Sequence, residues 1–389
     1  MGASAGLEVA DIVRRFAPAF RESHRGGLSR GQLRALSAIE QCRTAALGGH
    51  VYECAQCGAR KIVYNSCRNR HCPKCQSLDK ERWLAKRSGE LLPVPYAHVV
   101  FTLPAELNGL AQSHPRLLYD LLFRCAAETL LQIAADPKHL GARIGLLAVL
   151  HTWGQKLNLH PHLHCLVPAG GLSIDGDWWV WCRRRFFLPV RVLSRLFRGK
   201  LLAALRGAVD DGCLRLADRQ AFEVLLTTLY GKPWMVYSKP PFGGPRQVLQ
   251  YLARYTHRIA ITNSRLVRLE GDQVVFTWKD YASGQALREM ALPAKEFLRR
   301  FLLHVLPDHF VRIRSYGLLA NRQREKNLAL CRKLLPPGPP PAALSPAGDW
   351  RALLQQLTGH DPAVCPDCGQ SALRLVEELI PQRSGRAPP

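Results

Sequence analysis

The sequence predicts an α+β protein with a small metal-binding module near its N-terminus. From Tyr96 onward, strand-like and helical segments alternate irregularly, which is typical of an α+β domain. Residues 50–76 hold five cysteines and little apolar periodicity, which indicates a module held together by metal. With 389 residues, of which 47% are hydrophobic, the chain can bury a core, and we expect two or three domains.

Local patterns predict the individual elements in chain order. Apolar residues at helical spacing place two helices within the first fifty residues and another helix over residues 117–135. The strands expected after it are buried strands at residues 145–151 and 163–167, a hairpin of residues 172–174 with 178–181, a short strand at 234–237 before a proline and glycine break at 240–244, and a second hairpin within 265–278.

The chain is strongly basic. It has 54 Lys and Arg residues against 30 Asp and Glu, which gives a net charge of +24 and a pI near 10.0. This charge favours a polyanionic partner, and nucleic acid is the commonest one. A ribosome-associated protein or a biased base composition would produce the same balance, so charge alone does not decide the function.

Two features that the sequence lacks, a signal peptide and a membrane-spanning segment, indicate where in the cell the protein is expected. Residues 1–16 lack the basic-then-apolar pattern of a signal peptide, and the longest apolar run, residues 144–150, is far shorter than the ~18 residues that span a bilayer. We therefore expect an intracellular protein with no membrane partner. Its thiols would be reduced, so paired cysteines indicate metal ligands rather than disulfides.

The cysteine spacing predicts a structural zinc site. Two Cys-x-x-Cys pairs are separated by fourteen residues and offer four thiolates, the ligand set of tetrahedral Zn²⁺. The predicted ligands are Cys54, Cys57, Cys72 and Cys75, with Cys67 and His71 as substitutes for one of them. The basic residues of this module, which we expect to contact phosphates, are Arg60, Lys61, Arg68, Arg70 and Lys74.

A further pair, Cys365 and Cys368, follows a proline-rich stretch. One pair cannot complete a tetrahedron. His360, or residues from elsewhere in the chain, would have to supply the other ligands, and the role of this pair stays open.

Residues 160–164, with the sequence His-Pro-His-Leu-His, predict a second kind of metal site. Alternate side chains of a strand share a face, so His162 and His164 point to one side while Leu163 points to the buried side. Two imidazoles in this arrangement supply half of a metal site. The candidates for a third ligand are His160, His151 and Gln155.

Tyr251 and Tyr255 lie one helical turn apart, with Cβ atoms ~5–6 Å from each other. Pro245 suits the first turn of the helix that would carry them. The two phenols fall beside an apolar stripe, and Arg254 and Arg258 lie further round the helix. Taken alone, they could equally be two tyrosines at the edge of a core.

The histidines and tyrosines together indicate one chemistry. A phenol has a pKa near 10 and attacks poorly unless it is activated. A divalent ion on His162 and His164 would polarise a phosphate oxygen, and Arg254 or Arg258 would stabilise the phenolate. The combination suits cutting a nucleic-acid strand through a covalent phosphotyrosine.

These residues resemble the two-tyrosine, HUH-type rolling-circle transposases of bacterial insertion sequences. The resemblance covers roughly residues 25–330, through the segments 42–44, 48–50, 64–76, 160–164, 239–245, 251–258 and 312–324. It implies an antiparallel, HUH endonuclease-like sheet flanked by helices, with the histidine pair on a central strand. It also implies catalytic Mg²⁺ or Mn²⁺ at the histidines, both tyrosines as nucleophiles, and single-stranded DNA at element ends and target sites as the substrate.

The expected division follows from this resemblance. Residues 1–95 would form the helices and zinc-binding domain, 96–280 the catalytic domain, 281–335 a basic helical region that contacts DNA, and 336–389 a proline-rich linker and tail. We expect a bacterial cytoplasmic protein associated with the nucleoid. No G-x-x-x-x-G-K-[ST] loop is present in the sequence, so a host helicase would have to supply any unwinding.

Two alternatives stay open at this point. A plasmid rolling-circle replication initiator or a relaxase shares the chemistry, although many of these proteins carry a helicase. A non-catalytic zinc-dependent DNA-binding regulator would explain the charge and the cysteines but would leave the histidines and tyrosines unused.

Overall fold

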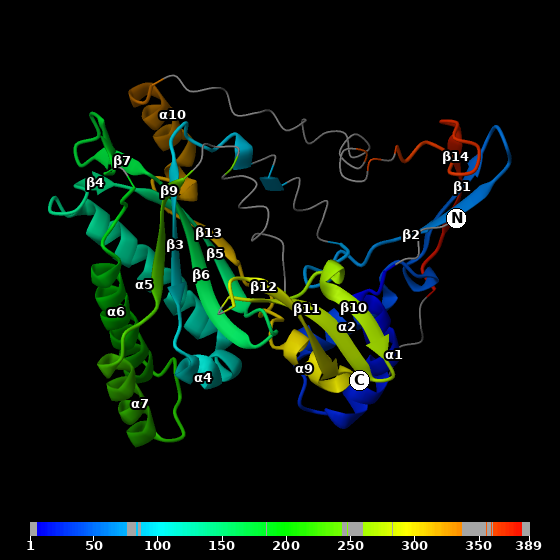
Figure 1. The fold of residues 1–389 in the computed structure, drawn as a ribbon, viewed down its shortest axis with the longest axis horizontal. Coiled ribbons are helices and arrows are strands. Elements are labelled where there is room, and N and C mark those ends of the chain that lie inside the picture. Colours follow the sequence, from blue (N-terminus) through cyan, green and yellow to red (C-terminus); the bar gives the residue numbers. More distant parts are fainter. Residues whose placement is uncertain are drawn as a thin grey trace.

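The computed structural model describes residues 6–75, 83–84, 87–183, 185–242, 247, 260–281, 283–336, 355, 359 and 361–382. Within them it confirms the α+β class, with helices that flank antiparallel sheets (Figure 1). The α-helices are α1 (Val9–Ser23), α2 (Arg30–Gln41), α4 (Asn108–Ser113), α5 (Pro115–Ala135), α6 (Val190–Asp210), α7 (Arg219–Gly231), α9 (Ala294–Leu302) and α10 (Arg324–Leu334). The strands are β1 (Gly49–Cys54), β2 (Arg60–Tyr64), β3 (Tyr96–Thr102), β4 (Ala142–Arg143), β5 (Gly145–Trp153), β6 (Leu159–Pro168), β7 (Gly170–Ser173), β8 (Trp179–Trp181), β9 (Val236–Phe242), β10 (Leu266–Glu270), β11 (Gln273–Asp280), β12 (Ala286–Pro293), β13 (Ile313–Gly317) and β14 (Leu373–Leu379).

The largest sheet has five strands in the order β13-β5-β6-β3-β9, and each neighbouring pair is antiparallel. The two buried strands predicted from apolar runs are present as β5 and β6. Strand β6 carries His162 and His164 and lies in the middle of the sheet, as the resemblance implied.

One face of this sheet is buried against helices. Leu163, Cys165 and Val167 of β6 point into an apolar core, together with alternate residues of β3 and β5. Helices α5 and α6 cover this face (Figure 1). The two-residue period of the apolar positions therefore fixes which side chains of β6 face the other way.

The opposite face is divided along its length. At one end Leu147 and Leu166 are paired across β5 and β6 and lie in an apolar cluster with residues of α10. At the other end histidines occupy the same face, because His151 is paired with His162 four residues further along each strand. This half of the face therefore carries imidazole rings, whereas the other half is covered by the apolar cluster that includes residues of α10.

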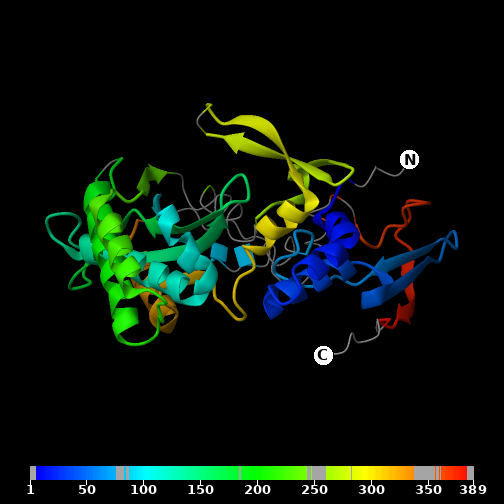
Figure 2. The same ribbon diagram turned by 90° about the horizontal axis from the view of Figure 1, so that it is seen from below.

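A second core joins the N-terminal helices to a distant part of the chain. Ile12 of α1 and Leu36 of α2 pack in one cluster with Phe297 of α9 and Phe276 of β11. Figure 2 shows α1 and α2 beside α9, with the sheet β10-β11-β12 extending from them. The predicted domain boundaries stay predictions, and this packing crosses two of them.

The N-terminal hairpin of β1 and β2 gains a third strand from the other end of the chain. Strand β14 pairs with β1 in antiparallel register, from Gly49 opposite Leu379 to Cys54 opposite Leu373. The two strands lie side by side in both views (Figures 1 and 2).

Two expectations about local structure were wrong. Strand β9 runs on through Pro240 and Pro241 instead of ending before them, which is tolerated because β9 is an edge strand and prolines there break no ladder bond. Within the region expected to be basic and helical, residues 281–335, the stretch 294–335 is not helical throughout, since Ile313–Gly317 forms the edge strand β13 beside β5. The hairpins predicted around residues 175–176 and 270–272 are both present, as β7 with β8 and β10 with β11.

Leu163→Ala tests whether burial behind β6 stabilises the fold. Leu163 is fully buried, so the substitution should lower the free energy of unfolding by about 2–5 kcal/mol. Leu287→Ala is the control, because Leu287 is 67% exposed and should change stability by less than about 0.5 kcal/mol. Denaturant unfolding measures both, and equal effects of the two variants would contradict the packing described here.

Candidate metal centre and cleft

Three histidines from neighbouring strands converge on the open half of the sheet. His162 and His164 come from β6, and His151 comes from β5. The ring centroid of His151 lies 5.3 Å from the ring centroid of His162 and 4.5 Å from that of His164. The ring centroids of His162 and His164 are 4.9 Å apart. One nitrogen of each ring lies within 4.8 Å of the other two, so the three can hold a single ion.

His160 does not join this group. Its side chain is exposed at the start of β6, and its backbone carbonyl accepts a hydrogen bond from Nδ1 of His162 at 2.7 Å. His151, which sequence reasoning gave as a competitor, takes the third position among the described residues. Strand pairing puts it there, since His151 is directly opposite His162.

The hydrogen bond to His160 also fixes the tautomer of His162. A carbonyl oxygen can only accept, so Nδ1 of His162 carries the proton and Nε2 keeps its lone pair for a metal.

Loss of hydration in the cleft lowers the pKa of His162 to about 4. Burial holds the pKa of His164 well below its usual range. Both rings are therefore neutral near pH 7, which is the state that ligates metal.

His98 of β3 is a functional candidate that the sequence did not reveal. Its Nε2 lies 2.8 Å from Nδ1 of His164, and the two rings stack with centroids 5.1 Å apart. If His164 donates from Nδ1, its Nε2 is free of a proton and can bind a metal, so His98 can orient a ligand without contacting the ion. His98 precedes the histidine segment by 62 residues, and only the pairing of β3 with β6 brings them together.

The histidines line a cleft of about 470 Å³. Its opposite wall comes from strand β11 and the residue after it, through Trp278, Lys279 and Tyr281. The ammonium of Lys156 lies 4.1 Å from the centroid of the Trp278 ring, a cation–π contact. The cleft thus combines imidazoles, exposed aromatic surface and positive charge.

The turn between β5 and β6 is anchored from the second core. Its carbonyls accept hydrogen bonds from Arg265 at Gln155 (2.5 Å) and from Arg300 at Lys156 (3.0 Å). Nε2 of the buried His304 lies 3.1 Å from the carbonyl of Leu157. These bonds hold the wall of the cleft against the part of the molecule that contains the second core, including α9.

The predicted nucleophiles Tyr251 and Tyr255, with Arg254 and Arg258, lie outside the described residues. Their part in the site stays a prediction.

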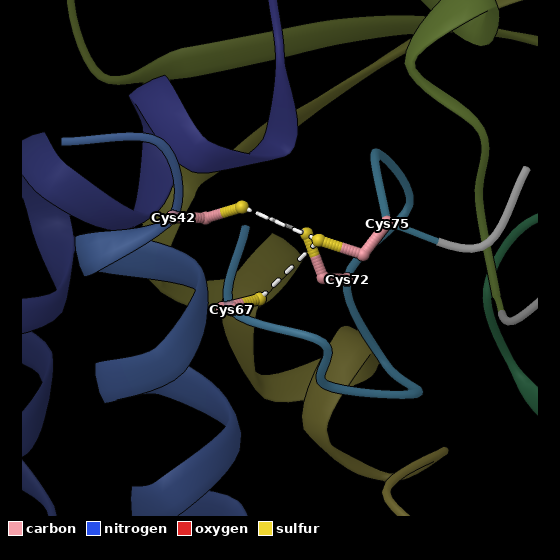
Figure 3. Close-up of side chains that lie close together, drawn as sticks. All are labelled: Cys42, Cys67, Cys72 and Cys75. Carbon is pink, nitrogen blue, oxygen red and sulfur yellow. Dashed lines mark hydrogen bonds between the residues drawn. The ribbon is translucent and has the colours of Figure 1, made fainter. Parts of the chain in front are cut away.

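The cysteines form two quartets instead of the predicted one. In the first, Cys42 at the end of α2 joins Cys67, Cys72 and Cys75 (Figure 3). The sulfur atom of Cys75 lies 3.4 Å from that of Cys42 and 3.6 Å from that of Cys67. A tetrahedral Zn²⁺ with 2.3 Å bonds has edges of about 3.8 Å, so the four thiols fit that ion.

The predicted set of Cys54, Cys57, Cys72 and Cys75 is thus divided between two places. The physical reason is the β1–β2 hairpin, whose turn carries Cys54 and Cys57, while Cys67 and the next pair follow it. Cys67, the predicted substitute, lies in the first quartet. His71, the other substitute, does not: Nε2 of its buried ring accepts from the backbone N–H of Leu306 at 3.2 Å.

Several basic residues expected to contact phosphates are used within the fold. Arg70 donates to the carbonyls of Phe310 and Pro307 at 2.7 and 2.8 Å, and Lys74 pairs with Glu8 at 2.6 Å. In the basic stretch after residue 294, Glu296 pairs with two arginines of α9. Arg70 and Lys74 thus connect the zinc module to other parts of the fold, whereas the Glu296 pairs lie within one helix. All of these basic groups are less available to a polyanion.

Comparisons with known proteins agree with this architecture, in which clustered histidines on an antiparallel sheet follow a cysteine-rich module. A family model described as "Putative transposase" matches residues 145–327, and one described as "Transposase zinc-binding domain" matches residues 12–103. The class is therefore a transposase with an N-terminal zinc-binding domain.

Two curated relatives define the class more closely. "Putative transposase y4qJ" of Sinorhizobium fredii (strain NBRC 101917 / NGR234) is 53% identical over 383 residues, which is 96% of each chain. "Transposase for insertion sequence element IS801" of Pseudomonas savastanoi pv. phaseolicola is 31% identical over 363 residues, 88% of this chain and 83% of that protein. The chain belongs to the family of insertion-sequence transposases that includes these two proteins, as the sequence resemblance predicted. No solved structure matches it significantly.

The zinc-binding domain matched by the family model contains the whole first quartet, which confirms that structural Zn²⁺ is to be expected in this region. Among the described helices, none combines the length and apolar character needed to cross a bilayer.

His304→Gln tests a pH dependence that arises from burial. Burial lowers the pKa of His304 from 6.5 to about 4. Between these two pH values His304 is therefore protonated in the unfolded chain but still neutral in the folded chain. Stability from this group is present above pH 6.5 and is lost towards pH 4. Between pH 7 and pH 4.5 the loss should be on the order of 2–3 kcal/mol.

Denaturant unfolding at both pH values measures this loss in the wild-type protein and in His304→Gln. The variant should lose less stability than wild type over the same interval. An equal loss in the two proteins would show that His304 does not titrate as a buried neutral ring.

Proposed function

We propose that the chain cuts and rejoins single-stranded DNA at the ends of its insertion sequence through 5′-phosphotyrosine intermediates. The observation that carries this proposal is the convergence of His151, His162 and His164 in a cleft with an aromatic, basic wall. The family membership supplies the substrate class, because transposases act on DNA. Neutral imidazoles can ligate a divalent ion on the open side of the sheet, and the family resemblance implies that this ion is Mg²⁺ or Mn²⁺.

In the proposed reaction Tyr251 or Tyr255 attacks the phosphorus of the scissile phosphodiester. The bond from phosphorus to the tyrosine oxygen forms and the bond to the 3′ oxygen breaks. The phenol loses its proton and the departing 3′ oxygen gains one, which leaves a free 3′ hydroxyl. The ester conserves the energy of the broken bond, so the strand can be rejoined without ATP, and the second phenol allows a second cleavage before the first is resolved.

The protein side chains have distinct parts in this proposal. The ion would be held by His151, His162 and His164, and His98 would orient His164. An ion held there would supply Lewis-acid polarisation of the scissile phosphate. Arg254 and Arg258 stabilise the phenolate. Structural Zn²⁺ is bound by Cys42, Cys67, Cys72 and Cys75, whose four thiolates leave no open coordination position.

The cleft wall suits an unpaired strand better than a duplex. The ring of Tyr281 and the face of Trp278 that Lys156 does not cover can stack on bases, and Lys156 and Lys279 can contact the backbone. Stacking of this kind is open only to bases that are not covered by neighbours in a helix.

A labelled single-stranded oligonucleotide that carries the element's end tests the proposal. With Mn²⁺, the wild-type protein should form an adduct that survives denaturation, and mass spectrometry should map it to Tyr251 or Tyr255. The double variant His162→Ala with His164→Ala should form at least about 100-fold less adduct, as should wild type in chelator, because the phosphate is no longer polarised. Tyr251→Phe with Tyr255→Phe should form none while still binding the oligonucleotide.

His139→Ala serves as the control, since His139 lies after α5 and does not line the cleft. It should form the adduct at the wild-type level. Full adduct formation by the histidine double variant would show that the two histidines are not needed for strand cleavage. An adduct in the tyrosine double variant would show that neither tyrosine is the nucleophile.

Trp278→Ala should weaken binding of single-stranded DNA by about 1–3 kcal/mol, because one stacking platform is lost. Trp181→Ala is the matched control, since Trp181 is half exposed on β8 and lies outside the cleft. Fluorescence anisotropy with a short oligonucleotide measures both. If the two variants bind equally well, the strand does not run along this wall.

A further inference from the structure

The second cysteine quartet joins residues from opposite ends of the chain. Cys54 and Cys57 lie at the turn of the β1–β2 hairpin, and Cys365 and Cys368 precede β14. The family models match residues 12–103 and 145–327, so the C-terminal pair lies outside both.

We propose that these four cysteines bind a second structural Zn²⁺ that links the C-terminal segment to the N-terminal hairpin. The proposal does not depend on strand cleavage, and its test does not measure transposase activity.

The sulfur positions fit one ion. The sulfur atom of Cys54 lies 3.6 Å from that of Cys368, and the sulfur atom of Cys57 lies 3.7 Å from that of Cys365. These separations match the edge of about 3.8 Å expected for a tetrahedral zinc site with 2.3 Å bonds. All four sulfur atoms lie within 4.8 Å of one another.

The two pairs also have the same backbone geometry, although they are far apart in sequence. In each, the glycine after the second cysteine donates its N–H to the carbonyl of the first cysteine, at 2.9 Å in both turns. The N–H of the first cysteine donates to the carbonyl two residues beyond the second, at 2.9 and 2.8 Å. Gly58 and Gly369 both have left-handed φ angles, +70° and +73°. Two equivalent turns that face each other are how a zinc ribbon presents four thiolates.

The docking of β14 holds the two turns together independently of the sulfur atoms. Six residue pairs join β14 to β1, and the N–H of Ala55 donates to the carbonyl of Ala372 at 2.9 Å. At the far end of the strand pair, a Cβ on Gly48 would lie only 2.3 Å from the carbonyl oxygen of Leu379. The absence of a side chain at Gly48 therefore permits the close approach of the C-terminal segment.

These observations describe a site that is already assembled by the fold. Four protein thiolates fill the coordination shell of Zn²⁺ and leave no position for a water or substrate. The ion is therefore structural, and its effect is to hold β14 against β1.

Metal analysis of the purified full-length protein tests the proposal. Wild type should contain two zinc ions per chain, one for each quartet. Cys365→Ser with Cys368→Ser should contain one. Cys182→Ser with Cys213→Ser is the matched control, because neither residue belongs to a quartet, and it should contain two. A wild-type content of one, or an unchanged content in the Cys365 and Cys368 variant, would overturn the proposal.

Alkylation of the native wild-type protein gives a second measurement in case the variant does not fold. Cys57 and Cys213 are both exposed. Cys213 should react with iodoacetamide at once, whereas Cys57 should react at least about tenfold more slowly until a zinc chelator is added, because a bound thiolate is a poor nucleophile. Peptide mass spectrometry follows each residue. If Cys57 in the native protein reacts as fast as Cys213, no ion holds it.

Discussion

The two-residue period of β6 is the constraint on which the candidate site depends. Leu163 and Cys165 are buried behind the sheet, so His162 and His164 must face the open side, and a slip of one residue would exchange the two sets. The pairing with β5 then brings His151 opposite His162. The turn between these strands is bonded to the lobe built from α1, α2 and α9, and the first cysteine quartet packs at the edge of the same core. The first quartet and the turn that bounds the histidine cleft therefore pack against the same apolar cluster, the turn through Leu157.

Much of the fold follows from local patterns in the sequence. Helices α1, α2 and α5 and strands β5 and β6 have clear apolar periods, and the β7–β8 and β10–β11 hairpins have turn residues that identify them. The histidine pair was recognisable for the same reason, since its side chains alternate within a single strand. What the sequence did not reveal is which residues the neighbouring strands bring beside it. His98 and His151 reach His164 through strand register, and register depends on pairing across the sheet rather than on local spacing.

The cysteines are a clearer example of residues whose partners cannot be predicted from local spacing in the sequence. Proximity in sequence suggested that Cys54 and Cys57 would share an ion with Cys72 and Cys75, yet the hairpin separates them and each pair finds its partners elsewhere. One signal was present: the Cys-x-x-Cys-Gly pattern occurs at residues 54–58 and again at 365–369. Two matching turns imply a common geometry even when some three hundred residues lie between them. The edge strand β13 and the continuation of β9 through its two prolines were also hard to predict, because a strand with one neighbour needs little apolar character and tolerates proline or charge.

The pairing of β14 with β1 has a consequence for biosynthesis. Cys57 and Cys365 are 308 residues apart, so at ~5–20 residues per second a ribosome needs roughly 15–60 s to make the intervening polypeptide. Throughout that interval the nascent hairpin offers an open edge, which is the kind of surface that pairs with strands of other chains. Closure of this sheet is thus a late event, completed only after β14 has emerged from the exit tunnel, and the proposed zinc site of the second quartet cannot be complete before then.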